Sequence, residues 1–228
     1  MSSQIKYVEV VNRALHTLMD HDESIILIGQ GVTSPWYVGG TCNGLLEKFG
    51  PKRVIDTPVS ECGTAALACG AAIAGLRPIL MFPRMDFMLY AMDPIINQMA
   101  KWSYMTGGRL HVPCVIWAII NRFGSQGAQH SQDFAWIFER IPGLKVVRPY
   151  TARMAMDLLC DAVYDDNPVV FVDDRALYNT TEEVTFPMEH TFTVDNCDFN
   201  RSYPAMPVPA GPTMEEEFYE HLFASAVH

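Results

Sequence analysis

The sequence has no long hydrophobic run and no basic cluster. No stretch of its 228 residues approaches the length of a membrane span, and the N-terminal segment MSSQIKYVEVVNRALHTLMD lacks the apolar core of a secretion signal. Only 18% of the residues are charged, and 26 acidic residues outnumber 16 basic ones. The net charge of −10 disfavours contact with nucleic acid and anionic membranes. We therefore expect a soluble, cytoplasmic protein that binds neither.

Cysteine spacings typical of metal or redox sites are also missing. None of the six cysteines forms a Cys-x-x-Cys pair, so neither a zinc site nor a disulfide framework is expected. Four of them lie among apolar or small residues, as in AALACGAA and VPCVIWAII. We interpret these four as buried, reduced thiols.

Signature motifs of several enzyme classes are absent as well. The sequence contains no G-x-G-x-x-G after a predicted strand, no G-x-x-x-x-G-K-[ST], no G-x-S-x-G and no H-E-x-x-H. It therefore carries no recognisable phosphate cradle of its own. Classical nicotinamide dehydrogenases, kinases and serine hydrolases are not favoured.

What the sequence does contain is a regular alternation of two hydrophobic periods. Short apolar runs bounded by Gly, Pro or charged residues predict buried parallel strands at 25–29, 53–56, 77–82, 113–120, 144–148 and 168–173. Longer segments predict helices at about 6–20, 60–75, 85–106, 131–140 and 151–164, the last capped by Thr151. This alternation predicts an α/β fold, a doubly wound, mainly parallel sheet of about six strands flanked by helices.

The C-terminal part has a different composition. Periodicity fades after residue 178, and residues 179–228 hold nine acidic residues and one basic residue, with four prolines between 204 and 212. Proline prevents a central strand or helix there. We interpret residues 1–180 as one domain and residues 181–228 as an acidic, Pro-rich arm that ends in a short helix, with a flexible tail as the alternative.

Polar segments follow three of the predicted strands, where ligands of open parallel sheets bind. These segments are Thr57–Glu61, Pro83–Phe87 and the Gly- and Gln-rich loop up to His130. Glu61 can serve as a catalytic carboxylate or simply as a favourable charge at a helix N-terminus. His130 can face a ligand or support a helix start. The residues by themselves leave both alternatives open.

Six strings of the sequence resemble one protein family. They are KFGPKRVIDTPVSECG, GAAIAGLRPI, INQMAKWSYMTGG, GAQHSQ, IPGLKVVRPYT and DDNPVVFVDDRALY. Between residues 5 and 185 they resemble, in order, the β subunit of the thiamine-diphosphate-dependent dehydrogenase component of 2-oxo acid dehydrogenase complexes. The resemblance implies the pyrimidine-binding domain that this family shares with transketolases.

The resemblance assigns roles to three candidate residues. Glu61, in the string TPVSE, is expected to hydrogen-bond N1′ of the aminopyrimidine of thiamine diphosphate and to favour its imino tautomer, whose nitrogen removes the thiazolium C2 proton. Such a role needs a carboxyl group shielded from water. Phe87 matches the aromatic residue that stacks on the pyrimidine ring, and His130 matches the active-site histidine that faces the substrate.

A structural potassium site is also implied by the resemblance. Family members hold the ion mostly by backbone oxygens, at positions that correspond here to Cys114, Ala162, Asp165 and Asn167.

Two positions depart from the family pattern. Gln30, expected near the cofactor, replaces a carboxylate of the family, and Met81 replaces an acidic residue. Substrate choice and full dehydrogenase activity are therefore open. The sequence also stops where the family continues into a second domain. Two alternatives follow: a separate chain supplies that domain, or the enzyme works without it.

The resemblance also implies a partner. The family's Gly-Asp-Gly…Asn motif, which holds the diphosphate and Mg²⁺, lies on an α-type subunit and is absent here. We expect a hetero-oligomeric, split thiamine-diphosphate enzyme that decarboxylates a 2-oxo acid and transfers the acyl group to an acceptor, active only with its partner. The alternatives are a split transketolase-like enzyme and a non-catalytic partner-binding subunit.

Overall fold

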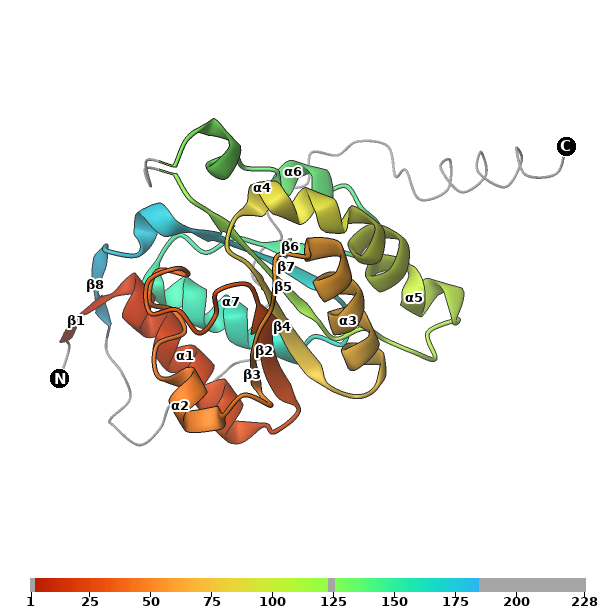
Figure 1. Cartoon of the computed structure of the whole chain (residues 1–228), viewed down its shortest axis with the longest axis horizontal. Helices are drawn as coiled ribbons and strands as arrows, with labels where there is room; N and C mark the ends of the chain where they lie inside the picture. Colours follow the sequence, from red (N-terminus) through yellow and green to blue (C-terminus); the bar gives the residue numbers. More distant parts are fainter. Residues whose placement is uncertain (1–2, 123–125, 185–228) are drawn as a thin grey trace, which may run out of the picture. The chain divides into compact units, whose positions relative to one another are not determined.

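The computed structural model describes residues 3–122 and 126–184 (Figure 1). The strands in this part are β1 (Ser3–Lys6), β2 (Ile25–Gly29), β3 (Val54–Asp56), β4 (Arg77–Phe82), β5 (Val115–Ile120), β6 (Lys145–Val147), β7 (Val169–Asp174) and β8 (Thr181–Val184). The α-helices are α1 (Tyr7–His21), α2 (Leu45–Phe49), α3 (Glu61–Ile73), α4 (Met85–Met88), α5 (Ala100–Met105), α6 (Ala135–Phe138) and α7 (Ala152–Tyr164). Segments of other helix types are η1 (Leu89–Ala91), η2 (Asp93–Met99), η3 (Ala128–His130) and η4 (Arg175–Leu177).

Six of the strands form one parallel sheet in the order β3-β2-β4-β5-β7-β6. Every residue of β2, β5 and β7 is buried, because helices cover both faces of a parallel sheet and leave no strand face in water. The predicted fold class is confirmed.

The helices lie in two layers, one on each face of the sheet (Figure 1). On one face, strand residues such as Ile28, Leu80 and Ile116 pack with alanines of α3 and with η1, η2 and α6 in one hydrophobic cluster. On the other face α1 and α7 pack against each other. The Thr151 hydroxyl accepts a hydrogen bond from Met154 N at 3.1 Å, so the predicted cap of α7 is confirmed.

A buried carboxyl group connects α1 to the sheet. Asp173 of β7 has no exposed surface, and its Oδ1 accepts a hydrogen bond from the Tyr7 hydroxyl at 2.9 Å. Its Oδ2 accepts hydrogen bonds from the Trp117 indole at 3.0 Å and the Tyr178 hydroxyl at 2.6 Å. Tyr7 N also donates to the Thr180 carbonyl at 3.0 Å, so backbone contacts replace a side-chain cap where α1 begins. This cluster fixes the start of the chain to the sheet.

The predicted helix over 85–106 is interrupted. It consists of α4, η1, η2 and α5 in succession, and η2 has π-helical geometry with Pro94 in its first turn. Proline has no N–H and its ring clashes with the carbonyl of the preceding turn, so a regular α-helix cannot pass through it. The helix expected over 131–140 shrinks to α6, because residues before it form contacts of their own, described below.

Besides the short turns η3 and η4, three elements in the described part of the chain were not predicted. They are α2 and the two strands β1 and β8, which pair antiparallel with each other. Both strands are short and lack a clear alternation of apolar and polar residues. They can therefore be recognised only from their pairing with each other in the structure. β8 consists of Thr181–Val184 and so lies just after the expected domain boundary at 180. The rest of the predicted arm, 185–228, lies outside the described residues.

Burial of the cysteines follows the expectation. Cys42, Cys69, Cys114 and Cys160 are buried, whereas Cys62 is exposed, and none of these five forms a disulfide with a described residue. Cys197 lies outside the described residues. No helix in the described part of the chain is long and apolar enough to cross a membrane.

The buried Asp173 carboxyl group should make the stability of the fold depend on pH. Burial raises the pKa of this carboxyl group to about 6 against the three hydrogen bonds that lower it. The folded state therefore keeps a proton that the unfolded chain, with an ordinary pKa near 3.9, loses. Consequently the contribution of Asp173 to the free energy of unfolding is largest below about pH 4, falls by on the order of 2 to 3 kcal/mol up to about pH 6, and is constant above it.

The measurement is urea unfolding between pH 4 and 8 for the wild type and Asp173→Asn, whose carboxamide can still bond Tyr7, Trp117 and Tyr178. We expect the difference between the two proteins to change by that amount from pH 4 to 6, to the disadvantage of the wild type. A difference independent of pH would contradict the assignment.

Candidate functional site

The strand order places a ligand site at one point of the sheet. From β2 the chain first adds β3 on one side and then crosses to add β4 on the other side. At such a reversal the loops after the two strands separate, and a crevice opens beyond their carboxyl ends. This point lies between the carboxyl ends of β2 and β4, next to the start of α3.

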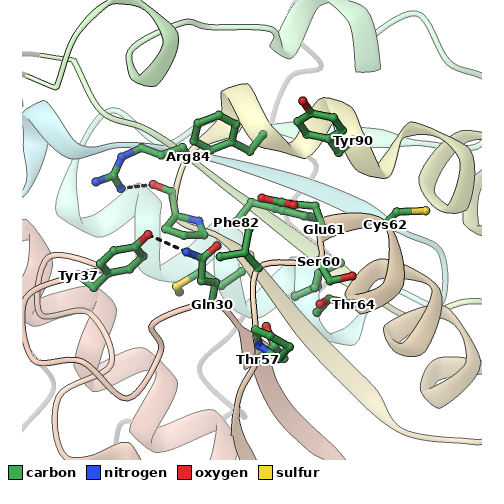
Figure 2. A pocket seen from close by; sticks show the side chains of 16 residues that line it. Gln30, Tyr37, Thr57, Ser60, Glu61, Cys62, Thr64, Phe82, Arg84 and Tyr90 are labelled. Atoms are coloured by element: carbon green, nitrogen blue, oxygen red, sulfur yellow. Dashed lines mark hydrogen bonds between the residues drawn. The ribbon is translucent and has the colours of Figure 1, made fainter.

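A cavity of about 500 Å³ occupies this position. Its volume lies within the range of small-molecule sites. The lining residues are Gln30, Tyr37, Thr57, Pro58, Val59, Ser60, Glu61, Cys62, Thr64, Leu80, Met81, Phe82, Pro83, Arg84, Phe87 and Tyr90. Glu61 and Arg84 are the two charged residues among them. Figure 2 shows Arg84 and Tyr37 together on one side of the cavity and Ser60, Glu61 and Cys62 at the start of α3 on the other.

Glu61 is the first residue of α3 and a wall of this cavity. α3 begins here because the backbone of the TPVS segment turns away from β3, and Thr64 N then donates to the Ser60 carbonyl at 2.8 Å. The side chain is partly exposed, and it forms no hydrogen bond or ion pair with any residue that the structure describes. The carboxylate is therefore available to a ligand, favoured by the helix N-terminus.

Gln30 and Tyr37 form a second wall. Gln30 Nε2 donates to the Tyr37 hydroxyl at 2.8 Å. The turn between them is held by Asp56 at the end of β3, whose Oδ1 accepts from Gly31 N at 2.8 Å. Gly31 has a positive φ of 70°, and a Cβ there would lie 2.2 Å from the Tyr37 ring. Only glycine therefore lets Tyr37 fold back over the loop.

Met81 lies deep in the cavity, at the position where the resemblance expects an acidic residue. It is buried and pairs in register with Gly29 of β2. A Cβ on Gly29 would lie 2.4 Å from the Met81 carbonyl oxygen. The close approach of β2 and β4 at the base of the cavity thus requires glycine at 29.

Phe87 and His130 contact each other edge to face. Phe87, in α4, lines the cavity, and its ring centroid lies 5.1 Å from that of His130 with the two planes at 90°. His130 belongs to η3 and stands behind Phe87 rather than in the cavity lining. Its Nδ1 is buried and has no hydrogen-bond partner among the described residues.

The loop that carries His130 is anchored by Asp86. The Asp86 Oδ1 accepts hydrogen bonds from Gln132 N at 3.2 Å and Gln132 Nε2 at 2.8 Å. Further along, Asp133 Oδ1 accepts from Ala135 N at 3.1 Å. These contacts keep residues 131–134 out of a helix, which explains why α6 begins only at Ala135.

The predicted potassium ligands lie at the opposite, amino-terminal edge of the sheet. Cys114 and Asn167 precede β5 and β7, and Ala162 and Asp165 lie in or just after the last turn of α7. The Cys114 carbonyl accepts from Val169 N at 3.0 Å. The Asp165 carbonyl accepts from the Arg77 guanidinium at 3.3 Å, and its carboxylate binds Lys145. The four residues lie in one region, but two of the carbonyl groups already accept hydrogen bonds.

The structure therefore brings Glu61, Phe87 and Gln30 into one cavity and places His130 against Phe87. The cavity also contains Tyr37 and Arg84, for which the sequence analysis predicted no role. Arg84 had a signal, since it directly follows a predicted strand at the edge where ligands bind. Tyr37 had none, because residues 30–44 are turns without hydrophobic periodicity.

The comparisons with known proteins agree on one family. Residues 3–181 match the family described as "Transketolase, pyrimidine binding domain". The β subunit of the pyruvate dehydrogenase E1 component of Rickettsia bellii is 42% identical over 186 residues, which cover 82% of this chain and 57% of that protein. The mitochondrial counterpart of Caenorhabditis elegans is 44% identical over 170 residues, which cover 75% and 48%. The chain thus spans about half the length of these relatives.

A solved structure shares the fold. The chain resembles a split-gene transketolase, described as an inactive β4 tetramer, with a TM-score of 0.62 and 20% identity over 82% of this chain and 56% of that one. At this identity the likeness supports the architecture of the sheet and its helices and nothing finer.

The loop that carries His130 should become more mobile when Asp86 is replaced. Replacing Asp86 by Ala leaves both Gln132 donors without their acceptor, which costs about 1 to 3 kcal/mol of unfolding free energy. We expect faster hydrogen exchange at the Gln132 amide and a lower stability. Asp86→Asn keeps an oxygen acceptor and serves as the matched control. Unchanged exchange at Gln132 in the Ala variant would show that Asp86 does not anchor the loop.

Proposed function

The chain belongs to the family of transketolase pyrimidine-binding domains, and from this premise we propose that its cavity binds the aminopyrimidine ring of thiamine diphosphate. We propose further that the chain is the β-type subunit of an enzyme that decarboxylates a 2-oxo acid such as pyruvate and transfers the acyl group. The observation that carries this proposal is the unpaired Glu61 carboxylate in the same cavity as the Phe87 ring.

The lining residues fit a flat, polar-edged heterocycle. Phe87, Met81 and Phe82 supply apolar surface for the ring faces. Glu61 supplies an oxygen at the ring edge, where it can hold a proton in a hydrogen bond to a ring nitrogen. Gln30 supplies a neutral amide where the family has a carboxylate. Thiamine diphosphate, when bound, would supply the electron sink that decarboxylation of a 2-oxo acid needs.

Glu61 needs a second chain to complete this site. A carboxylate that shares its proton with a ring nitrogen works best away from water, and here the side chain is partly exposed. Exposed apolar side chains stand at the rim of the cavity, namely Val59 and Tyr90, which are 69% and 73% exposed. We infer that an α-type subunit covers this rim and makes a hetero-oligomer.

The proposed enzyme needs metal ions that would bind outside the cavity. The sequence has no Gly-Asp-Gly…Asn motif, so we assign Mg²⁺ and the diphosphate to the α-type subunit. A K⁺ ion near Cys114, Ala162, Asp165 and Asn167 stays a prediction, to which the shared location of the four residues lends support. A cytoplasmic location is likewise a prediction, and several relatives carry "mitochondrial" in their names.

The two alternatives have less support. The relatives that match over most of the chain are named as pyruvate dehydrogenase subunits, whereas the likeness to a split transketolase concerns the fold alone. A non-catalytic subunit would have no need for an unpaired carboxylate next to an aromatic ring in a cavity.

The test is the Glu61→Gln variant in the complex reconstituted with an α-type subunit. Glutamine keeps the size and hydrogen-bonding reach but cannot hold the proton, so we expect kcat for pyruvate decarboxylation to fall by at least about 100-fold. Assembly with the partner should be unchanged, which gel filtration measures.

Glu47→Gln is the matched control, because Glu47 lies exposed on α2, outside the cavity. Its activity should equal that of the wild type. Near-normal turnover by Glu61→Gln would refute the role of Glu61. Absence of any cofactor-dependent turnover of pyruvate and branched 2-oxo acids in the wild-type complex would refute the proposed function.

A further inference from the structure

Arg84 is a buried cation in the wall of the cavity. Its side chain directly follows β4, is 5% exposed and lines the cavity beside Tyr37. Arginine is almost never buried to this degree unless it is paired. The position therefore calls for an explanation.

The hydrogen-bond partners of Arg84 are neutral. Its Nε donates to the Gln126 side-chain oxygen at 2.7 Å, and its Nη1 donates to the Pro83 carbonyl. A guanidinium group has five N–H donors, so three remain on Nη1 and Nη2. No carboxylate forms an ion pair with Arg84 in the described part of the chain. The nearby Asp86 acts on it through its charge alone, with Oδ1 accepting from Gln132 and Oδ2 buried without a hydrogen-bond partner among the described residues.

The surroundings make this charge costly. Burial lowers the pKa of Arg84 and the positive charge of Arg175 lowers it further, while Tyr37, Tyr178 and the carboxylate of Asp86 act in the opposite direction. A buried charge that is not held in an ion pair is costly to the fold. Such a group is retained where a ligand supplies the opposite charge.

Tyr37 provides a second donor at the same wall. Its hydroxyl oxygen accepts from Gln30 Nε2 at 2.8 Å, so its own proton is left for another acceptor. The Arg84 guanidinium lies over the Tyr37 ring at 5.7 Å from the centroid, which aligns the two groups. Both residues line the cavity, and they lie next to each other on one side of it (Figure 2).

We propose that Arg84, assisted by the Tyr37 hydroxyl, binds the carboxylate of the 2-oxo acid substrate. This inference rests on the proposed function, which puts an aromatic heterocycle against Glu61 and Phe87 and its diphosphate on the partner chain. The anion that comes to this wall is then the substrate's. A planar guanidinium matches a carboxylate with two parallel hydrogen bonds.

The test uses the complex reconstituted with the α-type subunit and compares the wild type, Arg84→Met and Arg84→Lys. Four quantities are measured: KM and kcat for pyruvate, the Kd of thiamine diphosphate, and calorimetric binding of pyruvate against pyruvamide, its uncharged analogue. Arg153→Gln is the matched control, since Arg153 pairs with Asp157 on α7 and lies outside the cavity.

For Arg84→Met we expect KM for pyruvate to rise about 10- to 100-fold, the effect of losing a hydrogen bond to a charged group. The preference for pyruvate over pyruvamide should be lost, and the Kd of thiamine diphosphate should stay constant. Arg84→Lys should recover part of the affinity. The melting temperature, measured alongside, should change little, because Gln126 still accepts from Asn121 at 3.0 Å.

Three results would overturn the inference. A weaker Kd of thiamine diphosphate with unchanged KM would identify the diphosphate as the anion. Unchanged binding of both ligands together with a lower melting temperature would make Arg84 a structural residue. An equal effect of Arg153→Gln would assign the change to overall charge. If the wild-type complex turns over no 2-oxo acid, the proposed function fails, and loss of pyruvate binding in Arg84→Met would then show an anion site of another enzyme.

Discussion

Glu61 and Arg84 face one cavity without forming an ion pair with each other or with any other described residue. The backbone keeps them apart, since Glu61 opens α3 after β3 whereas Arg84 follows β4, and β2 lies between those strands. All other lining residues are neutral. The two charges therefore decide how a ligand lies: a ring nitrogen that shares a proton belongs at Glu61, and an anionic group belongs at Arg84.

Much of the fold could be predicted because it follows from local patterns. Continuous apolar runs such as IILIG and VIWAII have no polar face, so they fit only a sheet covered on both sides. What could not be predicted depends on contacts between distant segments. β1 exists because β8 pairs with it, and Pro94 turns one expected helix into a succession of short ones.

The candidate site was predictable where a motif carried it. Glu61 and Phe87 stand at strand ends and within strings that resemble the family, and the structure brings both into one cavity. Tyr37 was beyond sequence reasoning, because its place depends on Gly31 having a positive φ and on Asp56 holding the turn. The environment of Arg84 could not be predicted either, because neither its burial nor the absence of an ion pair with a described residue follows from the sequence.

The central claim is that this chain is half of a thiamine-diphosphate site. The most direct measurement is affinity capture of the tagged protein from its source in the presence of thiamine diphosphate and Mg²⁺, with the bound chains and cofactor identified by mass. We predict that a chain carrying a Gly-Asp-Gly…Asn motif co-elutes in stoichiometric amount with the cofactor retained. A homo-oligomer without cofactor would contradict the account.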